Sequence, residues 1–254
     1  TCLYSDLSMM TDTASLDAAQ EYQTAAGGME KKKDFERTVS ETVQEKLGFQ
    51  CGRVFCETYF NEDAKQDVAS IIRQIIDVYD NRLAHIEWMT ESTRQEARKK
   101  LKAITVKVGY PDEWPQDKLS LVLKSPDQGG VYIDNIMEIL KASQDYSFKT
   151  RHDPVDRNEW GMTPQTVNAY YNPGNNEIVF PAGILQAPFY DPQAEPVANL
   201  GGIGAVIGHE ITHAFDTSGS QYDEKGNLRD WWTAQDKQHF RELAQKVIDY
   251  YDTM

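Results

Sequence analysis

Two histidines, His209 and His213, stand four residues apart in a segment whose residue spacing predicts an α-helix. Residues at this separation lie one turn apart on the same helix face, so both imidazoles can bind one metal ion. Glu210 is rotated off the pair but adjacent to it, which lets its carboxylate reach a metal-bound water without occupying a coordination position. The spacing therefore predicts two ligands and a general base, an apparatus suited to zinc-dependent amide hydrolysis.

Residues around the histidine pair favour a metal site over its alternatives, which are a chance pattern and histidines satisfied in the core. Each helical glycine costs roughly 1 kcal/mol relative to alanine, so packing must compensate for several of them. Asp216, three residues after His213, can accept the free ring N–H of a ligating histidine and orient it. The alternative for Asp216 is an aspartate in the turn that ends the helix. Small residues that would let neighbouring backbone come close are Gly201, Gly202, Gly204, Ala205 and Gly208.

The bulk composition is that of a folded globular protein and excludes several partners. A length of 254 residues is enough for one large domain or two smaller ones. The residues are 40% hydrophobic and 26% charged, as in ordinary globular proteins. A formal net charge of −14 would repel nucleic acid and anionic lipid headgroups. The one basic run, residues 94–102, is expected to be a solvated helix face. No segment reaches the ~18 uninterrupted apolar residues of a membrane-spanning helix. Cys2, Cys51 and Cys56 are expected to be buried, inert thiols.

Apolar residues that recur at helical spacing predict a mainly α-helical fold. Thr90 is placed to cap a helix that runs through Lys102. Thr233 and Asp236 resemble a capping box that opens a final helix. That final helix is expected to face inward through four residues, Phe240, Leu243, Val247 and Tyr251. The other expected helices cover residues 35–47, 66–89, 131–146 and 200–215.

A small β portion is predicted upstream of the histidine pair. Residues 166–171 and 177–180 are rich in β-favouring side chains, and the turn residues 172–175 separate them. This pattern predicts a hairpin. The fold class is therefore α+β, mainly α with a small β portion.

Four stretches of this sequence carry a resemblance to a known family: residues 167–171 (VNAYY), 177–186 (EIVFPAGILQ), 201–216 (GGIG through HEITHAFD) and 230–233 (DWWT), with weaker similarity at 86–89 and 108–112. Taken in order, they resemble the neprilysin and endothelin-converting enzyme family of zinc metallopeptidases, particularly its bacterial members. The resemblance implies a thermolysin-like catalytic lobe facing a second, mostly helical lobe, with the active site between them. A boundary after residue 129 would place residues 1–129 in the helical lobe and residues 130–254 at the start of the catalytic lobe.

The resemblance also implies an endopeptidase that uses one zinc ion and cleaves short peptides on the N-terminal side of hydrophobic residues. Asn168 and Ala169 match residues that bind the substrate backbone as an edge strand, a mode that the predicted hairpin permits. The pocket for the side chain after the cleaved bond would be lined by Ile184, Phe189 and Val206. The alternatives are a hairpin-turn role for Asn168 and plain core packing for the apolar residues.

One part of the family's pattern is missing from this sequence. The third zinc ligand is a glutamate in a Glu-Asn-x-x-Asp motif, and no such motif lies between Asp216 and Met254. The later histidine and arginine that stabilise the transition state are likewise absent. Thr1 is not a natural start residue, so we expect a fragment that alone binds zinc weakly and is inactive. The remaining C-terminal segment, in the same protein or as a second chain, would supply the missing ligand.

The rival hypothesis is a truncated, non-catalytic fragment that binds peptides or serves as an interaction surface. Glu210 argues against it, since a peptide-binding module has no use for a base that activates water. The resemblance favours the extracellular space or the cell envelope, and it is compatible with the cytoplasm for a bacterial member.

Overall fold

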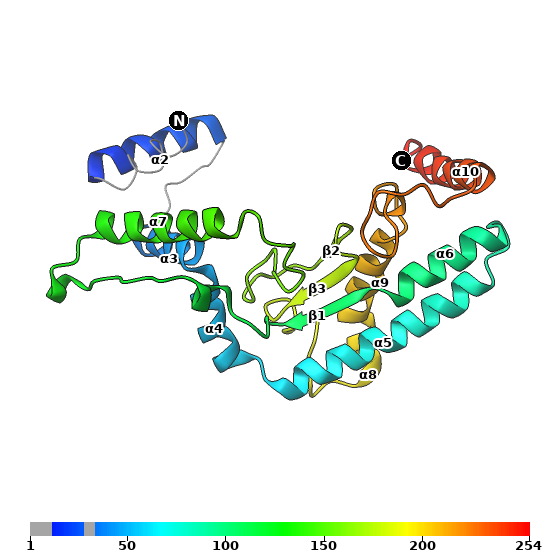
Figure 1. The fold of residues 1–254 in the computed structure, drawn as a ribbon, viewed down its shortest axis with the longest axis horizontal. Coiled ribbons are helices and arrows are strands. Elements are labelled where there is room, and N and C mark those ends of the chain that lie inside the picture. The colour runs from blue at the N-terminus through cyan, green and yellow to red at the C-terminus, as the bar shows by residue number, and fades with distance from the viewer. Residues whose placement is uncertain (1–11, 28–33) are drawn as a thin grey trace. The chain divides into compact units, whose positions relative to one another are not determined.

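The computed structural model describes residues 12–27 and 34–254, which form a mostly helical fold with one small sheet (Figure 1). The predicted fold class, mainly α with a small β portion, is confirmed. Within these residues no helix combines the length and the apolar character needed to cross a membrane. The helices are α2 (Thr13–Gly27), α3 (Phe35–Lys46), α4 (Gly48–Tyr59), α5 (Glu62–Ala84), α6 (Glu91–Lys102), α7 (Tyr132–Thr150), α8 (Pro196–Gly201), α9 (Ile203–His213) and α10 (Ala234–Tyr251), with short 3-10 turns at Pro115–Lys118, Pro126–Gln128 and Gly219–Gln221.

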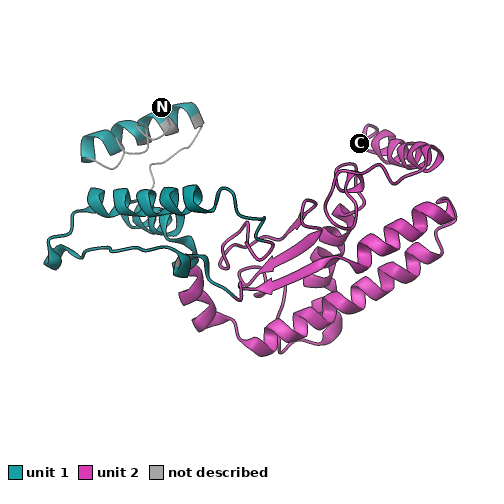
Figure 2. Ribbon diagram, viewed as in Figure 1, with its two compact units in different colours: residues 1–51, 113–156 teal, residues 52–112, 157–254 magenta. Residues whose placement is uncertain are grey.

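The chain divides into two compact units that alternate along the sequence (Figure 2). One unit joins the residues up to 51 with residues 113–156, and the other joins residues 52–112 with residues 157–254. Every candidate site residue lies in the second unit. The predicted boundary after residue 129 concerns the lobes of a longer protein, and it stays a prediction.

Most predicted helices form, with boundaries displaced by a few residues. The helix expected from residue 66 begins at Glu62, because the Asn61 side chain caps it by accepting the Ala64 N–H at 2.9 Å. It ends at Ala84, five residues before the predicted end. The helix expected over 131–146 continues to Thr150.

The glycine-rich helix expected over 200–215 is broken into α8 and α9 at Gly202. The Ile203 N–H donates to the carbonyl oxygen of Phe189 at 2.7 Å instead of continuing the helical ladder. A Cβ on Gly202 would stand 2.3 Å from that same carbonyl oxygen, so only glycine fits there. At Gly204 and Gly208 a Cβ would meet its neighbours only at ordinary contact distance. The expected close backbone approach is therefore limited to Gly202.

The sheet contains β1 (Thr105–Gly109), β2 (Tyr170–Asn172) and β3 (Glu177–Pro181) in the order β1-β3-β2. Strand β3 is central and fully buried, with β1 parallel on one side and β2 antiparallel on the other. The predicted hairpin is confirmed, but its first strand starts at Tyr170 rather than residue 166. Extending the register would place Asn168 opposite Pro181, which has no N–H to donate.

The core of the second unit holds α9 against α5 and the sheet. Ile203, Ile207 and Ile211 of α9 are completely buried, as are Val68 and Ile72 of α5. Burying a side chain of this size contributes roughly 1.5–3 kcal/mol. This packing determines which face of α9 turns inward, and it leaves the remaining face free for polar side chains.

A buried carboxylate, Asp236, joins the beginnings of α6 and α10. It accepts hydrogen bonds from the backbone N–H of Thr90 at 2.9 Å and from the hydroxyls of Thr90, Thr93 and Thr233. Thr233 caps α10 as predicted, accepting the Asp236 N–H at 3.1 Å. Thr90 occupies the predicted cap position of α6, but its hydroxyl donates to Asp236 rather than capping its own helix. The two helix starts therefore share one anion.

The prediction that α10 faces inward through four apolar residues is wrong. Leu243, Val247 and Tyr251 are exposed, and Phe240 is only half-buried. In the described part of the chain, Asp236 is the buried residue of α10. The helix is held at its first turn and by Phe240, whose ring centroid lies 5.6 Å from that of Trp232, whereas the later large apolar side chains are exposed.

Two of the predicted inert thiols lie within the described residues. Cys51 and Cys56 are free, and Cys56 is buried. Burial raises the pKa of the Cys56 thiol to about 12, so its reactive thiolate is scarce near neutral pH. The predicted burial is confirmed for Cys56 but not for Cys51, which is only half-buried, and Cys2 lies outside the described residues.

Replacing Asp236 with Asn should make the free energy of unfolding less dependent on pH in the acidic range. Burial alone would raise the Asp236 pKa, but hydrogen bonds from Thr90, Thr93 and Thr233 hold it at about 2, below the ordinary 3.8. The stability from this carboxylate is therefore fully present above about pH 5 and is lost as the pH falls toward 2. We expect Asp236→Asn to lower the free energy of unfolding by about 2 kcal/mol at pH 7, and by less at pH 3.

Urea denaturation at both pH values measures this difference. The exposed Asp249→Asn on the same helix is the control, and we expect it to change little. A deficit of Asp236→Asn that is equal at pH 7 and pH 3 would contradict the argument.

Candidate metal centre

The two histidines of α9 point their ring nitrogens at one another. Their Nε2 atoms lie 3.0 Å apart, with ring centroids separated by 4.6 Å and planes at 87°. Two nitrogens bound at about 2.0–2.1 Å to a tetrahedral ion lie roughly 3.3 Å apart, so a small adjustment would admit one zinc ion. His209 is exposed and His213 half-buried, so both can be reached from solvent.

The Asp216 carboxylate lies within hydrogen-bond distance of one ring nitrogen of His213. Its Oδ2 lies 2.7 Å from His213 Nδ1. A carboxylate can only accept a hydrogen bond, so the proton resides on Nδ1. The lone pair of the neutral ring is then on Nε2, the atom that faces His209. The structure thus places Asp216 in contact with His213, and its role as an orienting residue stays a prediction.

The turn after α9 holds Asp216 itself. Its other oxygen, Oδ1, accepts the backbone N–H groups of Ser218 at 2.8 Å and Gly219 at 2.7 Å. Burial opposes ionisation, yet these bonds and the one from His213 lower the Asp216 pKa. A Cβ on Gly219 would stand 1.8 Å from the carbonyl oxygen of His213, so the turn can close only around glycine.

Glu210 is buried although its neighbour His209 is exposed. Glu210 is only 6% exposed, and its carboxylate lies between α9 and the backbone of Tyr171. Burial raises the pKa of Glu210, while the two imidazoles and a hydrogen bond from the Tyr171 backbone oppose the rise. A raised pKa makes the carboxylate a better proton acceptor near neutral pH.

A cavity of about 330 Å³ brings the polar candidates together. Asn168 and Ala169 line it, together with His209, Glu210 and His213. The Asn168 side chain accepts the Ala169 N–H at 2.9 Å. The cavity is therefore bounded on one side by α9 and on another by the chain that enters edge strand β2. Its remaining lining residues are Tyr170, Tyr171, Pro173, Asp216, Ser218 and Gly219.

The three predicted pocket residues do not line this cavity. Ile184 is buried in the turn after β3, and Phe189 is half-buried where its carbonyl receives Ile203. Val206 is half-buried on α9. Their assignment to a substrate pocket stays a prediction, and plain core packing remains the alternative for all three.

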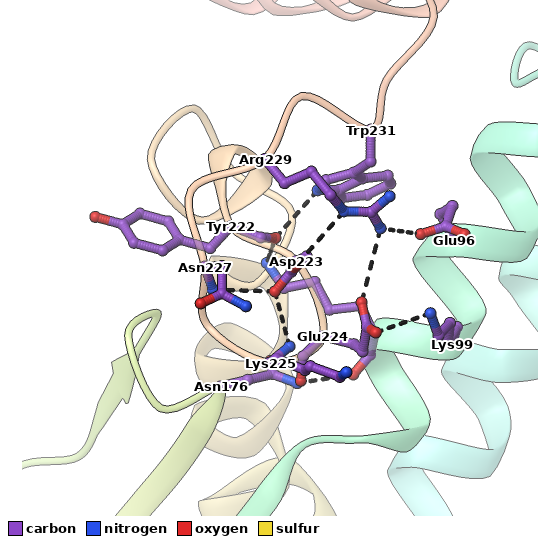
Figure 3. Close-up of polar contacts among 11 residues, drawn as sticks. Glu96, Lys99, Asn176, Tyr222, Asp223, Glu224, Lys225, Asn227, Arg229 and Trp231 are labelled. Atoms are coloured by element: carbon purple, nitrogen blue, oxygen red, sulfur yellow. Dashed lines mark hydrogen bonds and ion pairs between the residues drawn. The ribbon is translucent and has the colours of Figure 1, made fainter. Parts of the chain in front are cut away.

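No third ligand joins the histidine pair within the described residues, where no group of three His, Cys, Asp or Glu side chains could hold a metal. The nearby acidic loop is occupied by its own contacts (Figure 3). Asp223 accepts the backbone N–H groups of Lys225 and Asn227 at 2.9 and 3.0 Å. Glu224 pairs with Lys99 at 2.8 Å. These carboxylates fasten the loop and are not directed at the histidines.

One buried residue next to the site was not predicted. Lys100 of α6 is 1% exposed, although the basic run 94–102 was expected to be a solvated face. Its Nζ donates to the carbonyl oxygens of Ala214, Gly219 and Tyr222. The spacing of Lys100 from buried Ala97 is the available signal, because both lie on one helix face.

Comparison with known families gives matches over both parts of the chain. Models described as peptidase family M13 match residues 2–111 and residues 168–254. The second match includes the whole candidate centre.

Individual zinc peptidases and their structures are also similar to this chain. A neutral endopeptidase of Lactobacillus helveticus is 39% identical over 79% of this chain and 31% of its own length. Endothelin-converting enzyme 1 of Homo sapiens is 40% identical over 84% of this chain and 28% of its own length. The crystal structure of the Mycobacterium tuberculosis zinc metalloprotease Zmp1 with an inhibitor superposes with a TM-score of 0.84 at 40% identity, covering 96% of this chain and 36% of that one. The chain thus spans well under half the length of these relatives.

Asp216→Asn should weaken the preference of the His213 proton for Nδ1. A neutral amide oxygen holds the Nδ1–H less firmly than a carboxylate, and its NH₂ group can turn toward the ring instead. We expect the folded variant to show a mixture of the two imidazole tautomers at pH 8, where the wild type shows Nδ1–H alone. Nitrogen-15 NMR of the ring measures this, with Asp249→Asn as control. A wild-type spectrum with the proton on Nε2 would refute the assignment.

Proposed function

Because this chain belongs to peptidase family M13, we propose that it carries the first part of the active centre of a zinc-dependent endopeptidase that hydrolyses short peptides. The observation that supports this most directly is the pair of imidazole nitrogens 3.0 Å apart beside the buried carboxylate of Glu210. Since the chain spans under half the length of its relatives, the activity is proposed for the longer protein.

In this proposal His209 and His213 are zinc ligands and Asp216 orients His213. The proton that Asp216 keeps on Nδ1 leaves the Nε2 lone pair of His213 available. Neutral imidazole nitrogens are donors that zinc accepts. The donor set present is therefore compatible with zinc but supplies only two of the usual protein ligands.

Glu210 acts as the general base of the proposed reaction. Zinc, when bound, polarises the scissile carbonyl and makes its water more acidic. The Glu210 carboxylate takes a proton from the attacking water and later delivers it to the nitrogen of the leaving amine. Burial of Glu210, which raises its pKa, supports both halves of this role.

Asn168 and Ala169 would hold the substrate backbone at the edge of the sheet. They precede edge strand β2 and line the same cavity as Glu210, which supports recognition by strand addition. We propose Ile184, Phe189 and Val206 as the pocket for a hydrophobic residue after the cleaved bond. Support for that pocket is the family resemblance and the apolar character of the three side chains.

The centre would be completed from outside these residues. A third zinc ligand and the groups that stabilise the transition state would come from the remaining C-terminal segment, in the same protein or as a second chain. We therefore propose that the 254 residues alone bind zinc weakly and are inactive.

The competing function is a non-catalytic fragment that binds peptides through the edge of β2. Native mass spectrometry with a zinc assay separates the two. A bound second chain with one zinc ion per complex supports the enzyme. A stable, metal-free monomer that binds peptides would favour the binding fragment.

Glu210→Gln should abolish peptide hydrolysis in the full-length protein while leaving zinc bound. Glutamine keeps the size of the side chain but cannot accept the proton from water. We expect a fall in kcat of at least about 100-fold, the lower range for loss of general-base catalysis. Zinc content, measured beside turnover, should remain at the wild-type level. The exposed Glu195→Gln is the control, and appreciable turnover by Glu210→Gln would exclude Glu210 as the base.

A further inference from the structure

Lys100 is a buried ammonium whose three hydrogen bonds all go to backbone carbonyls. Its Nζ lies 2.8 Å from Ala214 O, 2.6 Å from Gly219 O and 2.8 Å from Tyr222 O. Within the described part of the chain, Lys100 forms no ion pair with a carboxylate. Only a protonated lysine can donate three N–H bonds at once, so the side chain matches this set of acceptors.

The three carbonyls belong to one segment, residues 214–222, which leads away from α9. Ala214 is the first residue after the helix, Gly219 opens a 3-10 turn and Tyr222 follows that turn. Asp216 lies between the first two of these anchors. Lys100 comes from α6, more than a hundred residues earlier, so it ties a distant helix to the turn that carries Asp216.

Gly219 links Lys100 directly to the histidine. Its carbonyl accepts from Lys100, and its N–H donates to Asp216 Oδ1 at 2.7 Å. Asp216 Oδ2 in turn accepts from His213 Nδ1 at 2.7 Å. A continuous series of hydrogen bonds therefore runs from Lys100 through Gly219 and Asp216 to His213.

Aromatic rings close the surroundings of Lys100. Its Nζ lies 5.7 Å from the centroid of Tyr171 and 6.0 Å from that of Trp231. Trp231 Nε1 also donates to Tyr222 O at 3.0 Å, as Figure 3 shows. Because little water reaches Lys100, its hydrogen bonds are electrostatically stronger than they would be in water. Breaking them would leave a buried charge without partners, which costs free energy.

We propose that Lys100 is a positioning residue for the metal centre. By holding residues 214–222 in place, Lys100 keeps the Asp216 carboxylate hydrogen-bonded to Nδ1 of His213. The expected effect of Lys100 on zinc binding rests on the proposed function. The structural step, control of the His213 proton through Asp216, is independent of zinc. The two can therefore fail separately.

Lys100→Met tests the proposal, because methionine keeps much of the length and loses the ammonium. In the folded variant we expect amide hydrogen exchange of residues 214–222 to accelerate by on the order of tenfold, while β3 exchanges as before. The His213 ring should show mixed tautomers by nitrogen-15 NMR. Zinc affinity of the full-length protein should fall roughly tenfold. A purely structural role would lower stability without altering the tautomer in the folded state.

Lys102→Met is the matched control. It makes the same change on the same helix, but its side chain is 59% exposed and pairs with Asp80 at 3.2 Å. We expect wild-type exchange, tautomer and zinc affinity from it. Equal effects of the Lys100 and Lys102 variants would overturn the proposal.

A second variant and a wild-type measurement cover the case in which Lys100→Met does not fold. Lys100→Gln keeps two N–H donors on a shorter stem, and we expect an intermediate effect on exchange and tautomer. In the wild type the Lys100 ammonium protons should exchange slowly enough to give a resolved NMR signal. Ammonium protons that exchange as fast as those of Lys102 would overturn the proposal without any variant.

The outcomes separate the two hypotheses. A wild-type full-length protein without zinc or hydrolysis, in which Lys100→Met still alters the tautomer, would overturn the proposed function alone. A wild type that binds zinc and hydrolyses peptides, with a Lys100→Met variant of unchanged tautomer and loop exchange, would overturn the positioning role alone.

Discussion

Burial of one face of α9 is the constraint on which the rest of the site depends. Ile203, Ile207 and Ile211 are completely enclosed by α5 and the sheet, so rotation of the helix would bring apolar side chains into water. With that face inside, His209 and His213 must project elsewhere. Tyr79 of α5 adds a directional contact, donating to the Gly208 carbonyl at 2.9 Å. Apolar packing sets the rotation of the helix, and hydrogen bonds then set the orientation of individual rings.

Buried charges organise the polar part of the same unit. Asp236 gathers hydroxyl and N–H donors from the starts of two helices, and Lys100 gathers carbonyl acceptors from one turn. Each charged group binds several backbone or hydroxyl groups at once. Buried polar groups need such partners, so these two residues connect segments that are distant in the sequence. The consequence is a site whose geometry depends on residues outside it.

Much of the centre could be predicted because its geometry is local. The separation of His209 and His213 and the adjacency of Glu210 follow from helical spacing, and the reach of Asp216 follows from its position three residues after His213. The hairpin was likewise readable from short-range preferences. The break at Gly202 was not, because it depends on a hydrogen bond to Phe189, a residue in a preceding loop.

Long-range features account for the other errors. Lys100 was placed in solvent because its charge suggested exposure, and its acceptors lie more than a hundred residues later. The final helix was expected to pack inward from its amphipathic pattern, yet Val247 is 57% exposed. A pattern predicts that a face is apolar, but it does not identify what covers that face. Asn168 and Ala169 reach the cavity, although the strand they were expected to extend begins at Tyr170.

The tight contact at Gly219 changes how much of the sequence should count as the signature of this centre. A side chain there would strike the His213 carbonyl, and the Gly219 N–H supports the carboxylate that faces the ring. The pattern required by geometry therefore extends from the five residues of His-Glu-x-x-His to an aspartate three positions later and a glycine three beyond that. Two added fixed positions make an accidental match several-hundredfold rarer, on the order of one in twenty for each. A search with this longer pattern would thus return fewer chance histidine pairs than a search with His-Glu-x-x-His alone.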